Sequence, residues 1–544
     1  MNGAGAIAHA LKLAGVDRIF SLSGNQIMPI YDACLDAEIA IVHVRHEAAA
    51  VYMADAHAQI TGGIGVALLT AGPGFANGLS PLFSARLAES PVLLISGDAP
   101  LSGDGLGAFQ EMDQTAVTAP LVKLALRPAT PQALAGDLAR CVRTALSGRK
   151  GPVHLALPFD LLNASQGAAP ALTQEDFLPD RRDLEPGAAA DIAGRILRAK
   201  RPLLLLGPQH TNSRSPDLSA ALHHAFKAPV VAMESPRGLR DPALGAFSEC
   251  LARCDLLVCL GKAIDFTLGF ARTPVLAASA EIIVVDPEAE LLGRAMRLVG
   301  DRVTTIQADA RAAIEALTAA AGAGDATEEF TRWTAEVAEA IAYRVETAET
   351  SRRPHPRQVC DAVNRVLSKA EDPILICDGG EFGQWAQACC SAPTRIINGV
   401  GGAIGGGLCF ALAAKLARPK ATVVVLMGDG TAGFHFTEFD TAAREGAAFV
   451  AIIGNDFRWN AEHQIQLRDY GADRLIGCEL SSEARYDKAA EAFACHGEYV
   501  TGAGDLDAAL ARALASGRPA CVNVEIQSVA APTVTRGETA PGAH

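Results

Sequence analysis

Two aspartates in the last third of the chain could hold a hard cation. Asp429 follows one apolar, strand-like run and Asp456 follows the next. If the two runs are neighbouring strands of a parallel sheet, both carboxylates lie at its carboxyl edge, where ligands bind in such folds. Mg²⁺ takes about six oxygen ligands, several of which come from substrate phosphates and water. The spacing therefore predicts a magnesium site for a phosphate-bearing ligand, although Gly-Asp-Gly, the sequence around Asp429, also occurs in ordinary turns.

The elements that would position these aspartates recur along the whole chain. Short runs rich in Val, Ile and Leu alternate with Ala-rich, helix-like stretches and are bounded by Gly, Asp or Pro. The clearest runs are 39–44, 65–70, 92–96, 203–207, 255–261, 282–286, 374–378, 423–427 and 449–454. This pattern is typical of parallel strands covered by helices on both faces. We therefore predict an α/β fold built of doubly wound parallel sheets.

Length and composition divide the chain into three such domains. At roughly 100–200 residues per domain, 544 residues predict about three. Two stretches without a sheet pattern, 162–187 and 319–353, are predicted to be linkers. We expect domains at 1–165, 187–320 and 350–530, followed by a flexible tail at 531–544. The first and third domains share a strand, glycine-rich turn and helix arrangement.

Charge and composition exclude several classes of protein. The 47 basic and 61 acidic residues leave a net charge of 47 − 61 = −14, and no basic cluster is present to neutralise a nucleic acid. No run of 18 apolar residues predicts a membrane span, and the N-terminal sequence lacks the pattern of a secretory signal. The thirteen cysteines show no CxxC pair, which fits reduced thiols in the cytoplasm.

The motifs of the chain resemble, in order and spacing, those of thiamine-diphosphate-dependent enzymes of the acetolactate synthase-like group. The matching segments of the first domain are 15–20, 23–26, 45–50, 72–78 and 108–113, and those of the third are 398–407, 428–430 and 455–459. The resemblance covers nearly the whole chain. It implies that the first domain binds the pyrimidine ring of thiamine diphosphate. The third would bind the diphosphate with Mg²⁺ or a similar divalent cation.

The resemblance also implies roles for individual residues. Glu47 matches the glutamate that hydrogen-bonds the aminopyrimidine ring and promotes the proton transfer that activates the cofactor, an acid/base task. Gln110 is a second catalytic candidate, and Ile404 matches the apolar residue that supports the bent cofactor. The other cofactor-binding candidates are Gly24, Asn25, Gly72, Pro73, Asn77, Gly379, Gly380, Gly402, Gly428, Asp429, Gly430, Thr431, Asn455 and Asp456. The metal ligands would be Asp429, Asp456 and the backbone carbonyl of Arg458, and the substrate-side residues Asn25, Gln26, Phe109, Gln110 and Trp459.

Two departures from the family pattern bear on the chemistry. The second asparagine of the diphosphate motif is Asp456 here, which adds negative charge around the cation. A similar Gly-Asn-Asp pattern occurs in the related 2-hydroxyacyl-CoA lyases. Residues 262–270 depart from the Arg-Phe-Asp-Asp-Arg run of true acetolactate synthases, so an FAD in the middle domain is disfavoured.

The leading hypothesis is an acetolactate synthase-like enzyme that makes or breaks a carbon–carbon bond next to a carbonyl, acting on a 2-oxo acid, an aldehyde or an acyl-CoA. The alternatives are a 2-hydroxyacyl-CoA lyase, an FAD-containing pyruvate oxidase-like enzyme and a non-catalytic cofactor-binding homologue. Glu47 argues against the last, since a protein without this chemistry has no need of that carboxylate. In the family each site lies between subunits, so the resemblance implies a homodimer or homotetramer.

Overall fold

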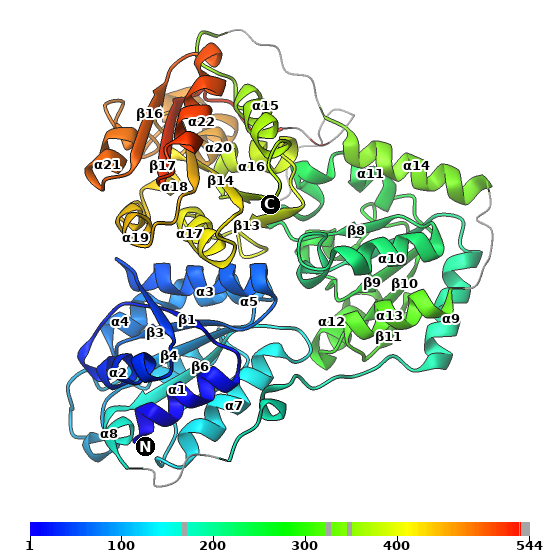
Figure 1. Ribbon diagram of the computed structural model, residues 1–544. Coiled ribbons are helices and arrows are strands. Elements are labelled where there is room, and N and C mark those ends of the chain that lie inside the picture. The colour runs from blue at the N-terminus through cyan, green and yellow to red at the C-terminus, as the bar shows by residue number, and fades with distance from the viewer. Residues whose placement is uncertain (166–170, 322–327, 345–350, 533, 535–544) are drawn as a thin grey trace.

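The computed structural model describes residues 1–165, 171–321, 328–344, 351–532 and 534. They form three α/β units, each built on a sheet whose strands are all parallel. In Figure 1 the first unit (blue to cyan) lies below the third (yellow to red), and the middle unit (green) lies beside both. The predicted fold class is therefore confirmed.

The first unit contains a six-stranded sheet in the order β2-β1-β3-β4-β6-β5. Its strands are β1 (Arg18–Ser21), β2 (Ala40–His43), β3 (Gly65–Leu69), β4 (Val92–Asp98), β5 (Ala125–Leu126) and β6 (Val153–Pro158). Its helices are α1 (Gly3–Leu13), α2 (Met28–Asp36), α3 (Glu47–Thr61), α4 (Pro73–Asn77), α5 (Leu79–Leu87), α6 (Gln114–Thr118), α7 (Ala133–Leu146) and α8 (Phe159–Asn163).

The third unit repeats that strand order, β13-β12-β14-β15-β17-β16. Its strands are β12 (Pro373–Cys377), β13 (Thr394–Ile397), β14 (Thr422–Gly428), β15 (Val450–Asn455), β16 (His496–Val500) and β17 (Ala520–Glu525). Its helices are α15 (Pro356–Leu367), α16 (Gly380–Cys389), α17 (Gly407–Ala417), α18 (Asp429–Ala432), α19 (Glu438–Arg444), α20 (Asn460–Tyr470), α21 (Tyr486–Ala492) and α22 (Leu506–Ala515).

The middle unit has a five-stranded sheet in the order β11-β10-β9-β7-β8. Its strands are β7 (Pro202–Leu206), β8 (Val230–Ala232), β9 (Leu256–Leu260), β10 (Glu281–Val285) and β11 (Val303–Ile306). Its helices are α9 (Pro186–Arg198), α10 (Pro216–Phe226), α11 (Phe247–Leu251), α12 (Ala289–Val299), α13 (Ala310–Ala320) and α14 (Glu328–Ala342). Short 3₁₀ turns join elements in each unit. They include η1 (Asn25–Ile27) in the first unit and η5 (Gly238–Arg240) and η7 (Phe266–Ala271) in the middle unit.

The stretch 319–353, expected to be a linker, is partly a packed helix. Helix α14 buries Trp333 and Val337 in the core of the middle unit, and the Trp333 indole Nε1 donates to the carbonyl of Pro202 at 2.9 Å. The middle unit therefore extends beyond residue 320. In the other expected linker, Phe177 is buried against the first unit. Residues 166–170, 322–327 and 345–350 of these stretches lie outside the described residues.

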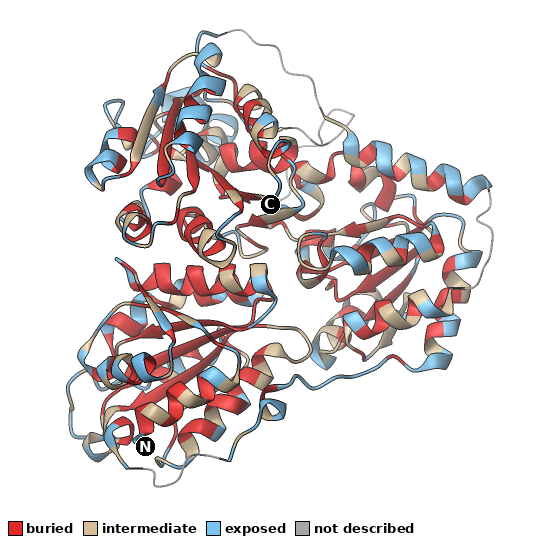
Figure 2. Ribbon diagram, viewed as in Figure 1, coloured by how far each residue is buried: buried red, intermediate tan, exposed pale blue. Residues whose placement is uncertain are grey.

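Helix α3 is the element that presents Glu47. The His46 ring accepts a hydrogen bond from the backbone N–H of Ala48 at 3.1 Å, which caps the helix at its start, and Gly62 ends it in a left-handed conformation. Its Ala-rich surface is buried on nearly all sides, so it packs closely against α17 of the third unit within one continuous core. Figure 2 shows this contact as facing buried helices.

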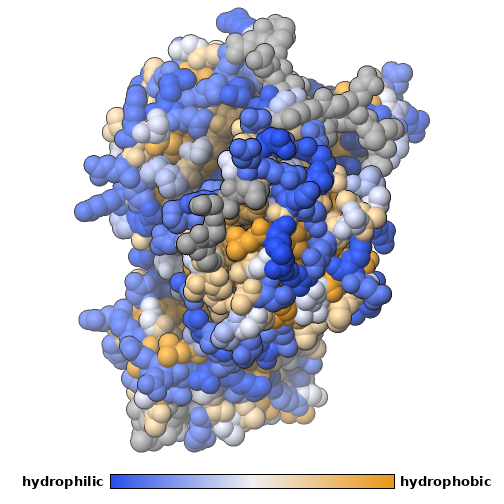
Figure 3. Space-filling model, turned by 90° about the vertical axis from the view of Figure 1, so that its right-hand side faces the viewer, coloured by the Kyte–Doolittle hydropathy of each residue, from blue (hydrophilic) through white to orange (hydrophobic). Residues whose placement is uncertain are grey.

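The surface of the molecule is largely hydrophilic on the side of the middle unit. Figure 3 shows hydrophilic residues over most of that face, with a more hydrophobic area near its centre. Among the described helices, none is both long and apolar enough to cross a membrane.

Candidate active site

A cavity opens at the point where the third sheet reverses its strand order. The chain continues from β12 to one side and from β14 to the other, and this divergence leaves a crevice beyond their carboxyl ends. The cavity measures about 280 Å³. The residues expected from the sequence that line it are Gly379, Gly380, Gly402, Ile404, Gly428, Asp429, Gly430, Thr431, Asp456, Arg458 and Trp459.

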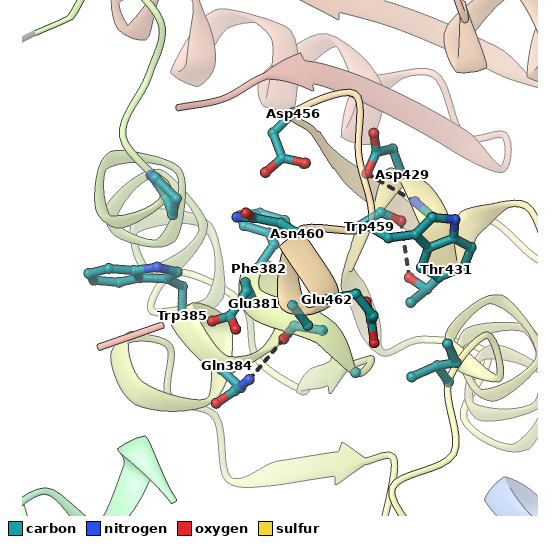
Figure 4. A pocket seen from close by; sticks show the side chains of 18 of the residues that line it. Glu381, Phe382, Gln384, Trp385, Asp429, Thr431, Asp456, Trp459, Asn460 and Glu462 are labelled. Atoms are coloured by element: carbon teal, nitrogen blue, oxygen red, sulfur yellow. Dashed lines mark hydrogen bonds between the residues drawn. The ribbon is translucent and has the colours of Figure 1, made fainter. Parts of the chain in front are cut away.

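Asp429 and Asp456 lie at one end of this cavity, and Glu381, Gln384 and Glu462 lie at the other (Figure 4). Burial raises the pKa of the Asp429 carboxyl to about 7, and the charge of Asp456 adds to the shift. Burial also raises the pKa of Asp456, to about 6. The end of the cavity at β14 and β15 therefore holds two carboxyl groups that a bound cation would stabilise in their ionised form.

The donors at this end fit a divalent cation that shares its shell with a phosphate. The described residues include no cluster of three or more His, Cys, Asp or Glu side chains that could enclose a metal. Two carboxylates and a carbonyl leave positions for phosphate oxygens and water, which is how Mg²⁺ is usually held. The backbone N–H groups of Gly430 and Arg458 donate to Asp429 at 2.9 and 3.2 Å and orient its carboxylate.

Two glycines allow large side chains to reach the cavity wall. A Cβ on Gly379 would lie only 2.4 Å from the Ile404 side chain, and one on Gly430 only 2.7 Å from the Trp459 ring. Because nothing larger than glycine fits at either position, Ile404 packs over the end of β12 and Trp459 over the start of α18. These contacts shape the cavity on both sides of the strand reversal.

Asn455 differs from the expectation that it binds the cofactor directly. Its side-chain Nδ2 donates to Asn523 Oδ1 at 3.2 Å, and its Oδ1 accepts from the backbone N–H of Phe457 at 3.2 Å. Asn455 is not among the residues that line the cavity. Its side chain instead holds the turn in which Phe457 takes a positive φ of 64° and which carries Asp456.

The C-terminal segment, whose flexible tail was expected to begin at residue 531, contacts the cavity wall. The Trp385 indole donates to the carbonyl of Ala530 at 3.0 Å, and the Asn460 amide donates to that of Val529 at 2.9 Å. Glu381 accepts a hydrogen bond from the backbone of Ala531. Residues 529–531 are thus held in place, whereas 533 and 535–544 lie outside the described residues.

Several lining residues were missed by sequence reasoning. They are polar or aromatic side chains of α16, α20 and the segment before α17, namely Glu381, Gln384, Trp385, Gln387, Asn398, Asn460 and Glu462. Among the described residues, Gln387 Oε1 and Asn398 Oδ1 are buried without a hydrogen-bond partner, which suits a polar ligand. One of them could have been found from the sequence: Glu381 follows Gly379-Gly380, directly after the expected strand 374–378, where ligand-binding residues of parallel sheets lie.

The residues expected from the first unit form a second group, at the corresponding strand reversal between β1 and β3. Glu47 is buried, and its Oε2 accepts from Asn77 Nδ2 at 3.0 Å. Gln26 Nε2 donates to Gln110 Oε1 at 2.7 Å. Gly72 has a φ of +60°, and a Cβ there would lie 2.9 Å from Gln110. The remaining members of the group are neighbours of these residues in the sequence: Gly24 precedes η1, Asn25 and Pro73 begin η1 and α4, and Phe109 precedes Gln110. Phe109 is 76% exposed.

Within one chain the two groups stay apart. The described residues that line the cavity come from the middle and third units, and none of the site residues expected from the first unit is among them. In a single chain the cavity that contains Asp429 and Asp456 is therefore formed without Glu47 and Gln110.

A second cavity, of about 450 Å³, lies between the first and middle units near the ends of β7 and β9. Asp286, at the end of β10, is fully buried and is held by Arg149, whose Nη2 lies 2.6 Å from Oδ2. Arg149 also pairs with Glu89. In dinucleotide-binding folds a strand-end carboxylate binds the ribose hydroxyls. Asp286 is paired with Arg149 and does not line the cavity, so it is not placed to bind the ribose of an FAD there.

Comparison with known proteins identifies the family. Sequence models of thiamine pyrophosphate enzymes match residues 1–117 as the N-terminal TPP binding domain, 189–317 as the central domain and 378–524 as the C-terminal TPP binding domain. The chain belongs to the thiamine pyrophosphate enzyme family. Thiamine pyrophosphate is thiamine diphosphate, so the resemblance inferred from the motifs is confirmed.

Two kinds of relative are similar to this chain over most of its length. The acetolactate synthase large subunit IlvG of Mycobacterium tuberculosis is 33% identical, over 96% of this chain and 95% of the relative. The 2-hydroxyacyl-CoA lyase 2 of Danio rerio is 31% identical, over 88% and 84%, and that of Homo sapiens is 30% identical, over 91% and 84%. The chain is thus a thiamine-diphosphate-dependent, acetolactate synthase-like enzyme that forms or cleaves carbon–carbon bonds.

Proposed function

We propose that the enzyme decarboxylates a 2-oxo acid and transfers the remaining fragment to a second carbonyl compound, with thiamine diphosphate bound through Mg²⁺. The observation that carries this proposal is the buried pair Asp429 and Asp456 at the strand reversal of the third sheet. Both aspartates and the carbonyl of Arg458 would bind the cation. The 33% identity to acetolactate synthases over nearly the whole chain supports a 2-oxo acid as substrate.

Thiamine diphosphate supplies an electron sink for the bond that breaks next to the carbonyl. The residues of the chain bind it, orient it and move a proton. Glu47 would accept the hydrogen bond of the aminopyrimidine ring, and the Asn77 amide fixes one of its oxygens for that task. Ile404 would support the bent cofactor, and Gln110 would lie on the substrate side, held by Gln26.

The separation of the two residue groups supports a site shared between subunits. If Glu47 of one chain faces Asp429 of another, a dimer made of one E47Q chain and one D429N chain has one doubly damaged site and one intact site. Mixing and re-associating the two inactive variants should therefore restore about a quarter of wild-type activity, because half of the random dimers are mixed. Each variant re-associated with itself is the control. No recovery, together with an active monomer in sedimentation, would contradict a shared site.

The aspartate at position 456 is expected to set the metal preference. The Asp456→Asn variant should still bind thiamine diphosphate but need more Mg²⁺. The Mg²⁺ concentration that gives half-maximal activity should rise by about tenfold, because one buried negative charge next to the cation is lost. Mg²⁺, Mn²⁺ and Ca²⁺ titrations of activity check this. Glu462→Gln, at the other end of the cavity, is the matched control. Identical titrations of wild type and Asp456→Asn would remove Asp456 from the ligand set.

A 2-hydroxyacyl-CoA lyase is the second candidate. It is favoured by Asp456, which matches the Gly-Asn-Asp pattern of that branch, and by relatives such as the Danio rerio protein. Assays of pyruvate and of a 2-hydroxyacyl-CoA on the same preparation separate the two: carbon dioxide release supports the first, and release of an aldehyde from the thioester supports the second. Flavin absorbance in the purified protein would instead favour the oxidase alternative.

We also propose a reducing compartment such as the cytoplasm. All thirteen cysteines are free thiols in the structure, and all but Cys389 are buried. Thirteen unpaired cysteines support that location, because disulfides form and persist in oxidising compartments.

A further inference from the structure

A loop of the middle unit reaches into the candidate active site. Ser235, Pro236 and Arg237 line the cavity, although the rest of its wall belongs to the third unit and the segment that follows β17. Pro236 lies against the glycine loop that carries Ile404, since a Cβ on Gly402 would be 3.5 Å from it. The loop therefore touches the segment expected to support the cofactor.

The position of this loop is fixed on both sides. Glu234, just before it, pairs with Arg395 on β13 at 2.6 Å and so ties the loop to the third unit. Gly238, just after it, has a φ of +52°, and a Cβ there would lie 2.3 Å from the backbone of Thr267. Between these anchors, the backbone N–H of Arg237 donates to Ser235 Oγ at 3.2 Å.

The charges around the cavity single out Arg237. Four carboxyl groups line the cavity, and its two cations are Arg237 and Arg458. The Arg458 guanidinium contacts His463 Nε2 at 3.1 Å, whereas that of Arg237 is exposed and, among the described residues, forms no hydrogen bond or ion pair. An exposed arginine with a fixed backbone and no partner is available for a ligand.

Arg237 lies on the side of the cavity formed by the end of β12 and the start of α16. The adjacent Pro236 packs against the loop of Gly402, and Ile404 of the same loop packs against Gly379, just before α16 begins. The charge of Arg237 also partly counteracts the rise that burial causes in the pKa of the Glu381 carboxyl. Glu381 lies opposite the Asp429 and Asp456 end in Figure 4. A diphosphate bound through the aspartates therefore leaves Arg237 facing the rest of the cavity.

We propose that Arg237 binds the carboxylate of the 2-oxo acid substrate and makes the site selective for anionic donors. This inference rests on the proposed function. A guanidinium presents two parallel N–H donors that match the two oxygens of a carboxylate, and the contact strengthens once cofactor and substrate exclude water. A neutral aldehyde acceptor gains nothing from Arg237, so the residue discriminates between the two substrates.

The test uses the full-length enzyme with thiamine diphosphate and Mg²⁺, and the variants R237M, R237K and, as a matched control, R240M. Arg240 is an exposed arginine three residues away that does not line the cavity. Pyruvate, 2-oxobutanoate and benzoylformate are assayed, and the acid that the wild type uses best is kept. R237M should raise its KM about 10–100-fold with kcat within about threefold, R237K should recover part of the loss, and R240M should match the wild type.

Thiamine diphosphate affinity, measured by calorimetry on the same variants, separates the outcomes. An unchanged affinity together with the raised KM supports the proposal, as does an unchanged KM for a neutral aldehyde acceptor. An unchanged KM for the 2-oxo acid overturns it. A cofactor affinity that falls while the KM rises also overturns it, because Arg237 then binds the diphosphate. If the wild type binds no cofactor, or binds it and uses none of the acids, the proposed function itself fails and the inference fails with it.

Discussion

The Glu47→Gln enzyme is expected to lose about 10²–10⁴-fold in kcat, the usual contribution of a positioned acid/base group. Glutamine keeps the size of the side chain and its contact with Asn77 but cannot hold the proton. Cofactor affinity should change by only a few-fold, since the diphosphate is held in another unit. Stability should fall by less than about 1 kcal/mol, the value of a carboxylate in the first turn of a helix. Single-turnover rates at saturating cofactor, compared with calorimetric cofactor titrations, check the prediction.

Asp32→Asn serves as the control for this experiment, because Asp32 is an exposed acid on α2 in the same unit. Its kcat should equal that of the wild type. A Glu47→Gln enzyme that retains more than about a tenth of wild-type kcat would show that Glu47 has no acid/base role.

The Asp429→Asn change is expected to have opposite effects on binding and on stability. Removing one member of a buried charge pair costs about 3–5 kcal/mol, so metal-dependent cofactor binding should weaken by about 10²–10⁴-fold. The metal-free protein, in contrast, should become more stable at pH 8. Its Asp429 carboxyl has a pKa of about 7, raised from 3.8 mainly by burial. Ionisation therefore destabilises the fold progressively between about pH 4 and pH 7, by at most about 4 kcal/mol.

The stabilising effect of Asp429→Asn on the metal-free protein should depend on pH. The Asp429 carboxyl has a higher pKa in the folded protein than in the unfolded chain, so the folded protein loses stability as the pH rises from the unfolded pKa to the folded pKa. Asparagine does not ionise, so the variant does not lose this stability. Part of the gain is offset because the amide cannot accept from both Gly430 and Arg458. We expect the Asp429→Asn change to raise the free energy of unfolding of the metal-free protein by about 1–2 kcal/mol at pH 8 and by less at pH 5. Denaturant unfolding in EDTA at both pH values measures it. An equal change in the free energy of unfolding at pH 5 and pH 8 would mean that the charge of Asp429 does not destabilise the folded protein.

The sequence was sufficient where a strong local pattern carries the information. The apolar runs that became β14 and β15 placed Asp429 and Asp456 together, because parallel strands bring their carboxyl ends to one edge. Helix α14 was taken for a linker because its composition is polar. The spacing of its buried residues, Phe330, Trp333, Val337 and Ala340, was the available indication of a packed face.

Contacts between residues far apart in the sequence could not be predicted from local sequence patterns. The Asn455 side chain binds Asn523 on another strand, 68 residues later, and no motif signals that pairing. Arg237 lines the cavity of the third unit although it belongs to the middle unit, and Glu234, close to it, pairs with Arg395 on β13. The hydrogen bonds that hold residues 529–531 likewise depend on side chains of α16 and α20. Such residues belong to the site through tertiary packing, which sequence periodicity does not encode.

The most direct test is a calorimetric titration of the purified, metal-stripped protein with thiamine diphosphate, with and without Mg²⁺. We expect one cofactor bound per chain in the presence of Mg²⁺, little binding in EDTA, and loss of the Mg²⁺-dependent binding in the Asp429→Asn protein. Absence of binding with Mg²⁺, or equal binding in EDTA, would contradict the claim that the buried aspartate pair holds the cofactor through a divalent cation.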